Sequence, residues 1–145
     1  MLRCPSEDIS LRLNPFAVVY EFSYTFNRFL THDFGWTEGV LKITQVKNSA
    51  EKVMLVEEDE RWINDGRFEP HRGNYPEYMG HSGPDMLAIR HDRQRIMPDL
   101  MNVGPWTGKW TPNPERKGNV AFVDGHADYV ERGYVHDQAH FDPRK

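Results

Sequence analysis

The segment from residue 118 to residue 132 constrains the fold of this chain most, because it predicts two short strands joined by a tight turn. The dipeptide Asp124-Gly125, flanked by apolar and aromatic residues, is the strongest short-range signal for a β-hairpin, since Gly accepts the positive φ that such turns require. The first strand, 119–123, is apolar on both faces, which is typical of a central strand. The second strand, 127–132, mixes apolar and charged positions, as a strand near the sheet edge does.

Length and composition predict a single domain over residues 1–145, with much of the chain in loops. A chain of 145 residues can bury one hydrophobic core, but only 38% of it is hydrophobic and it contains 11 Gly and 10 Pro. We therefore expect an α+β fold with a small, mostly antiparallel β-sheet and long loops. The predicted strands are residues 17–26, 52–57, 86–91, 119–123 and 127–132.

The charge pattern argues against nucleic acid or an anionic membrane as the main partner. The net charge is −4, no dense run of Lys or Arg occurs, and the arginines between 90 and 95 are interrupted by Asp92, which predicts an ordinary solvated surface. The single cysteine, Cys4, excludes an intrachain disulfide and a cysteine-rich metal knuckle. The sequence contains neither a signal-peptide pattern nor an apolar run of about 18 residues, so we expect no membrane span in this chain.

Two long segments rich in Pro and Gly separate the predicted strands, at 61–85 and 92–117. Long loops inside a compact domain often carry function. The second segment holds Trp106 and Trp110, which could present aromatic faces to a sugar or to a partner protein, or could fold down and cap the sheet. The last residues, 133–145, are expected to form a polar tail.

Polar side chains that could form a catalytic or metal site stand at the predicted strand ends: Glu58, His91, Asp124 and His126. Carboxylates and imidazoles are common metal ligands. One hypothesis is therefore a metal-dependent hydrolase in which His91, Asp124 and His126 hold the ion and Glu58 is the base. In the alternative, Asp124 is a turn residue chosen for its backbone hydrogen bonds, and His91 is a hydrogen-bonded structural histidine.

The acidic run from Glu57 to Glu60 also has two interpretations. It is either a solvated strand end or, in an exported protein, a binding site for Ca²⁺. The sequence contains no Gly-x-Ser-x-Gly elbow, no phosphate-binding glycine loop and no convincing Cys/His pair. Nucleophilic and phosphoryl-transfer chemistry therefore lack a basis in the sequence.

A series of short motifs runs in order through nearly the whole chain: Cys4-Pro5-Ser6, Ser23-Tyr24 with Asn27, residues 48–53, Glu57, Arg90-His91, residues 119–126, and Asp142-Pro143. Taken in this order, they resemble the C-terminal globular domain of the type IV pilin-like, prepilin-type proteins of planctomycetes. The hallmark of that family is a His, nine residues and then Asp-Gly. The segment Asn-Val-Ala-Phe-Val-Asp-Gly-His at 119–126 is the most specific part of the resemblance.

The chain differs from this family in two respects. His91 lies 33 positions before Asp124, whereas the family His lies ten positions before its Asp, which implies an insertion of 23 residues within 92–117. Family members also begin with a basic leader and a long apolar helix, which this chain as given lacks. We expect it to be a fragment of a longer prepilin or a stand-alone relative of the globular domain.

The resemblance implies a non-enzymatic structural subunit, pilin-like or pseudopilin-like, of an exported type II secretion or surface-filament assembly. Such a protein lies in the cell envelope or outside the cell, and its partners are other pilin-like subunits or envelope proteins. The residues to which the resemblance gives a structural role are His91, Asn119, Asp124 and Gly125. A sheet built to cover a helix exposes an apolar face without it, and the strand at 16–26 is the candidate for that face.

Overall fold

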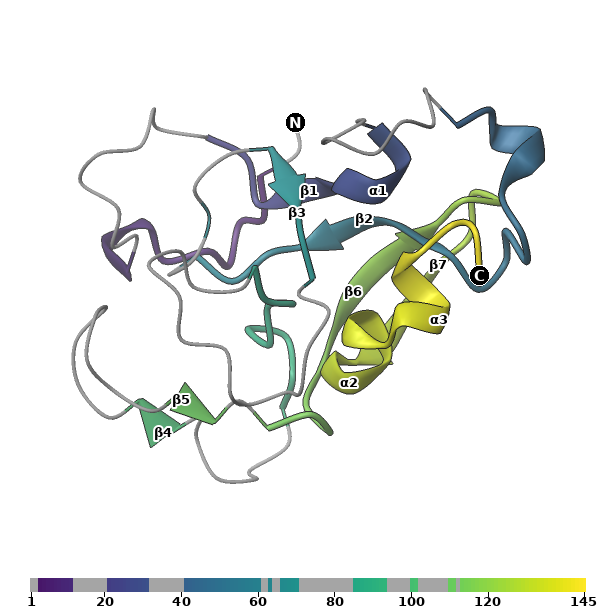
Figure 1. Ribbon diagram of the computed structural model, residues 1–145. Helices are drawn as coiled ribbons and strands as arrows, with labels where there is room; N and C mark the ends of the chain where they lie inside the picture. Colours follow the sequence, from purple (N-terminus) through teal and green to yellow (C-terminus); the bar gives the residue numbers. More distant parts are fainter. Residues whose placement is uncertain are drawn as a thin grey trace.

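The main feature of the computed structural model is a five-stranded sheet with the strand order β3-β1-β2-β6-β7 (Figure 1). The structure describes residues 3–11, 21–31, 41–60, 63, 66–70, 85–93, 100–101, 110–111 and 113–145. The strands of the sheet are β1 (Tyr24–Asn27), β2 (Val53–Glu57), β3 (Arg67–Phe68), β6 (Lys117–Phe122) and β7 (Ala127–Glu131). A separate two-stranded sheet pairs β4 (Leu100–Met101) with β5 (Trp110–Thr111).

The helices of the described residues are all short. They are η1 (Ile9–Leu11), α1 (Arg28–Thr31), η2 (Ile43–Gln45), α2 (Arg132–His136) and α3 (Gln138–Phe141). None of these helices has the length and apolar character that crossing a bilayer requires.

The pairing within the large sheet is antiparallel except between β1 and β3, which run parallel. The fold is therefore a small α+β fold with a mostly antiparallel sheet, as the sequence predicts. The bounds of β2, β6 and β7 agree with the prediction to within two residues. β1 coincides with the end of the predicted strand at 17–26, of which residues 17–20 lie outside the described part.

The hairpin of β6 and β7 closes as predicted. The Phe122 N–H donates to the His126 carbonyl at 2.8 Å, and the Gly125 N–H donates to the Phe122 carbonyl at 3.0 Å. Gly125 has a φ of 97°, which only a residue without Cβ adopts without strain. β6 lies inside the sheet, between β2 and β7, and β7 lies at its edge, in agreement with their apolar and mixed sequences.

One face of the sheet carries the core and is covered by α2 and α3 (Figure 1). Asn27 fixes α3 to this face, because its Nδ2 donates to the Val53 carbonyl at 2.7 Å and to the Phe141 carbonyl at 2.9 Å. The buried apolar residues that pack together here are Val53, Val56, Phe68, Leu87, Val120, Phe122 and Val135.

The opposite face carries four apolar residues that lie side by side across β1, β2, β6 and β7: Phe26, Leu55, Ala121 and Ala127. Residues directly opposite each other in antiparallel strands point to the same face. The first three are half-buried and Ala127 is exposed, so this face is less closed than the core face. We call these four residues the apolar row.

The prediction of a strand at 86–91 is wrong. The pairing of this segment is an isolated bridge between Leu87 and Glu58, and the chain then turns, with the Asp92 N–H donating to the Ile89 carbonyl at 2.9 Å. Met86, Leu87 and Ala88 are buried, which explains the apolar run without a strand. A short apolar run alone cannot distinguish the two arrangements.

The prediction of a polar tail at 133–145 is also wrong. These residues contribute most of α2 and all of α3, which bury Val135 and Phe141. Each helix is too short to show a helical repeat of apolar positions, so the sequence pattern gave no helix signal.

We predict that Gly118→Ala destabilises the fold. A Cβ at Gly118 would lie 2.1 Å from the Ala88 carbonyl oxygen and 2.8 Å from Leu87 Cγ, so β6 must move away from the segment beside it. We expect the free energy of unfolding, measured by urea denaturation, to fall by about 1 to 3 kcal/mol. The control is Gly133→Ala in α2, where the nearest atom would lie 3.4 Å away. Equal losses in the two variants would contradict this explanation.

Candidate functional site

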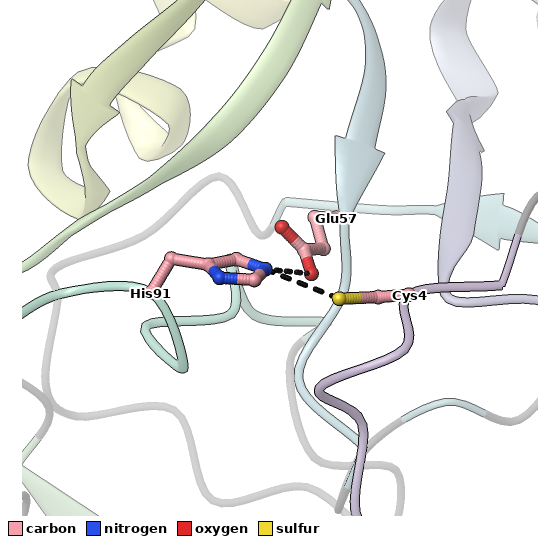
Figure 2. A group of neighbouring side chains, drawn as sticks. All are labelled: Cys4, Glu57 and His91. Carbon is pink, nitrogen blue, oxygen red and sulfur yellow. Dashed lines mark hydrogen bonds and ion pairs between the residues drawn. The ribbon is translucent and has the colours of Figure 1, made fainter.

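Three segments far apart in the sequence bring Cys4, Glu57 and His91 together (Figure 2). The Nε2 atom of His91 lies 3.1 Å from Cys4 Sγ and 3.2 Å from Glu57 Oε1. The three potential ligand atoms all lie within 4.8 Å of one another. We call these residues the Cys4–Glu57–His91 cluster. Among the described residues, this is the group of His, Cys, Asp or Glu side chains whose spacing could hold a metal ion.

Cys4 is held in place by Ser23, the residue that directly precedes β1. The Cys4 N–H donates to Ser23 Oγ at 2.7 Å, and Ser23 Oγ in turn donates to Glu7 at 2.8 Å. The Ser23 carbonyl accepts a hydrogen bond from the Glu58 N–H at 2.8 Å, which extends the pairing of β1 with β2. Ser23 therefore joins the N-terminal segment to the strand that carries Glu57.

His91 is placed by the segment 85–93, which runs beside the end of β2. The Ala88 N–H donates to the Glu57 carbonyl at 2.7 Å, next to the Leu87–Glu58 bridge. The turn that follows carries His91 to the Glu57 side chain, where Figure 2 shows the imidazole pointing toward the other two residues.

Glu57 is the centre of this polar group. Its side chain is fully buried, and Oε1 accepts a hydrogen bond from Arg90 Nη1 at 2.7 Å while Oε2 accepts one from Asn119 Nδ2 at 2.7 Å. A buried carboxylate is tolerated only when ion pairs and hydrogen bonds replace its hydration. Arg90 and Asn119 meet that requirement and also fix the orientation of the carboxylate.

Arg90 is itself held between two carboxylates, since Nη2 lies 2.5 Å from Glu60 Oε2. Burial lowers the pKa of the Arg90 guanidinium, but the hydrogen bonds and charges of Glu60 and Glu57 outweigh that effect and raise the pKa above its usual range. Arg90 is therefore a permanent cation beside the cluster.

The surroundings of Cys4 favour the thiol over the thiolate. Burial raises the pKa of the Cys4 thiol, and the hydrogen bond and negative charge of Glu57 raise it further. The pKa of the thiol is therefore raised, because a thiolate beside a buried carboxylate is unfavourable.

The structure separates residues that the hydrolase hypothesis placed in one site. Asp124 and His126 lie exposed at the tip of the β6–β7 hairpin, where His126 Nδ1 is 2.5 Å from Asp124 Oδ1. Asn119, which contacts Glu57, and Phe122, which precedes the hairpin tip, lie about 10 Å apart along β6. His91 belongs to the other end of that strand, with Glu57.

Glu58, the base of that hypothesis, is buried and lies in the bridge with Leu87. It is not part of the Cys4–Glu57–His91 cluster. At the hairpin tip, Asp124 Oδ1 accepts the His126 N–H at 3.1 Å, which is the turn role that the alternative hypothesis gave it.

The two tryptophans of the sugar-binding hypothesis fall largely outside the description. Trp106 lies outside the described residues. Trp110 begins β5, and the placement of its ring is not described.

The acidic run is not a solvated strand end. Glu57, Glu58, Asp59 and Glu60 are all buried. Two of them pair with Arg90, and Asp59 lies 3.8 Å from Arg132. These pairs leave the run poorly suited to Ca²⁺, which prefers several carboxylate oxygens that are not committed to cations. Arg90 is likewise buried rather than part of a solvated surface.

Sequence reasoning missed the cysteine of the cluster. It found no convincing Cys/His pair, yet Cys4 and His91 meet although they are 87 positions apart. No spacing rule finds a pair at that separation. The available signal was that Cys4, Glu57 and His91 each belong to the ordered motifs quoted above.

A scan against protein-family models and searches among curated proteins and among solved structures each find no significant match. The functional argument therefore rests on the residues of this chain and on their geometry.

We predict that Glu57→Ala destabilises the protein strongly. The change removes one of the two carboxylates that pair with Arg90 and leaves the buried amide of Asn119 without this acceptor, so we expect a loss of about 2 kcal/mol in the free energy of unfolding. The matched control is Glu131→Ala in β7, where the side chain is 55% exposed and lies 4.0 Å from Lys117. There the loss should stay below about 0.5 kcal/mol. Similar denaturation curves for the two variants would refute the central role of Glu57.

We predict that the Asp124 carboxyl titrates below its ordinary range. The hydrogen bonds from the His126 side chain and backbone lower the pKa of Asp124. A lowered pKa in the folded state means that this carboxylate stabilises the fold above its unfolded pKa and loses that effect as the pH falls through the folded pKa.

Carboxyl NMR chemical shifts followed through an acid titration measure this midpoint. His126→Ala should move it back toward the ordinary value, whereas His140→Ala, at a different site, should not. An unchanged midpoint in His126→Ala would show that the side-chain contact is absent in solution.

Proposed function

We propose that this protein is a non-enzymatic structural subunit, a pilin-like or pseudopilin-like globular domain of an exported secretion or surface-filament assembly. The observation that carries the proposal is the apolar row, which crosses four strands on the face opposite to α2 and α3. The sheet of the family that the motifs resemble packs against a long apolar helix. A continuous, partly open apolar row is suited to such a partner.

The described residues of the strand at 16–26 agree with this assignment. Phe22 is 41% exposed, while Tyr24 and Phe26 are half-buried and alternate with the buried Ser23 and Thr25. Aromatic side chains therefore line the less closed face along residues 22–26, and one of them, Phe26, belongs to the apolar row.

The motif residues support the proposal because their contacts are architectural. Asn27 joins β2 to α3, and Asn119 joins β6 to the buried Glu57. Gly125 supplies the positive φ of the hairpin turn. Such roles are expected in a domain whose function is assembly, since they hold the sheet that presents the docking face.

No observation among the described residues favours the two rival functions as they were formulated. The ligand set His91, Asp124 and His126 is divided between two ends of β6. The aromatic pair of the sugar-binding hypothesis lies in a part of the chain whose side chains are not described.

We predict that a photo-crosslinking residue at Ala127 captures an apolar helix of an envelope subunit. Ala127 is the exposed member of the apolar row, so a helix docked on the row must pass close to it. The variant is produced in cells of the source organism, irradiated and fractionated. Peptide mapping by mass spectrometry should then place the crosslink on an apolar helical segment of a pilin-like or other envelope subunit.

The matched control carries the same photo-crosslinking residue at Ile43, which is 66% exposed but lies in η2, away from the row. This position should give few adducts. Recovery of the uncrosslinked chain from the cytosolic fraction, or equal yields at the two positions, would overturn the proposal.

A further inference from the structure

We infer that Cys4, Glu57 and His91 form a three-ligand site for a transition-metal ion, with Zn²⁺ as the best match. This inference goes beyond the proposed function and does not depend on it. The site combines a thiol, a carboxylate and an imidazole that converge from three separate segments (Figure 2). A mixed set of sulfur, nitrogen and oxygen donors suits Zn²⁺ and related ions, whereas Ca²⁺ and Mg²⁺ select oxygen donors.

The spacing of the ligand atoms is close to what tetrahedral Zn²⁺ requires. Bonds of about 2.3 Å to sulfur and about 2.0 to 2.2 Å to nitrogen and oxygen, at tetrahedral angles, separate the ligand atoms by about 3.3 to 3.6 Å. The observed separations are 3.2 Å between His91 Nε2 and Glu57 Oε1, and 3.1 Å between His91 Nε2 and Cys4 Sγ. An ion therefore fits if the sulfur moves outward by about half an ångström.

The surroundings of Glu57 resemble those of a metal-binding carboxylate. Ligating carboxylates are commonly oriented by hydrogen bonds from neighbouring groups, and here Arg90 and Asn119 each donate to Glu57 at 2.7 Å. A carboxylate oxygen has two lone pairs, so Oε1 can accept from Arg90 and still bind an ion.

The charge of Arg90 opposes the binding of a cation, but the local balance compensates for it. Glu60 pairs with Arg90 and offsets its charge. The carboxylate of Glu57 and the thiolate of Cys4 then match the two charges of the ion. Binding releases the thiol proton to solvent as the Cys4–metal bond forms.

Access to the site is through His91. The His91 side chain is 34% exposed, whereas Cys4 is 5% exposed and Glu57 is fully buried. Three protein ligands leave one position of a tetrahedral ion for water. The arrangement thus allows an ion to enter from solvent and leaves it one exchangeable ligand.

The geometry does not match the main rival use of these residues, a cysteine nucleophile with a His–acid pair. In such a triad, one imidazole nitrogen faces the nucleophile and the other faces the acid. Here Cys4 and Glu57 both approach the same nitrogen, Nε2 of His91. Convergence on one nitrogen is the arrangement that a shared metal ion requires.

The test is a titration of the purified, tag-free chain with Co²⁺ after treatment with EDTA. We expect one equivalent to bind, with a thiolate-to-metal charge-transfer band and the visible bands of four-coordinate Co²⁺, and we expect Zn²⁺ to displace it. Cys4→Ser should remove the charge-transfer band, and His91→Ala should weaken binding by at least about tenfold. His126→Ala and His140→Ala, which alter histidines outside the cluster, should bind as the unmodified chain does.

A second measurement uses the unmodified chain, so it does not depend on whether the variants fold. Cys4 is the only cysteine, and alkylation by iodoacetamide therefore reports on this one thiol. One equivalent of Zn²⁺ should slow the reaction severalfold, and EDTA should restore it. Absence of the charge-transfer band together with unprotected alkylation, or a band that persists in Cys4→Ser, would overturn the proposal.

Discussion

The buried carboxylate of Glu57 is the interaction on which the described structure depends most. An ionised carboxyl group loses several kcal/mol of hydration on burial unless charges and hydrogen bonds replace it. Its partners, Arg90 and Asn119, come from a turn and from a neighbouring strand, so satisfying this one group fixes how three segments meet. The Glu57–Arg90 ion pair thereby fixes how the segments meet at this end of the sheet. The apolar core instead holds α2 on the opposite face.

The parts of the fold that could be predicted from the sequence are those made by local contacts. The β6–β7 hairpin is specified by Asp124-Gly125 and its flanking strands, and its turn hydrogen bonds join residues that are close in the chain. The Cys4–Glu57–His91 cluster is the opposite case, because Cys4 and His91 are 87 positions apart. Only the tertiary fold brings such residues together, and neither periodicity nor spacing encodes the pairing.

The burial of the acidic residues from Glu57 to Glu60 could not be predicted from the sequence either. Four consecutive acidic residues ordinarily predict a solvated segment, because charged side chains are rarely buried alone. In this chain Arg90 and Arg132 reach the run from later segments, and these long-range pairs reverse the expectation. The same pairs explain why Arg90 is buried although the sequence predicts a solvated surface there, whereas Arg93 is exposed as predicted.

The proposed metal site and the apolar row lie on the same face, because Glu57 follows Leu55 by two residues in β2. An ion held by residues 4, 57 and 91 would bind the folded chain, in which the three segments meet, and not the unfolded chain, so it would stabilise the fold. Its stabilising effect would be greatest where Cys4 and Ser23 attach the N-terminal segment to the sheet. The row instead is held by the strand pairing of β1, β2, β6 and β7, so a partner could dock there whether or not the ion is bound.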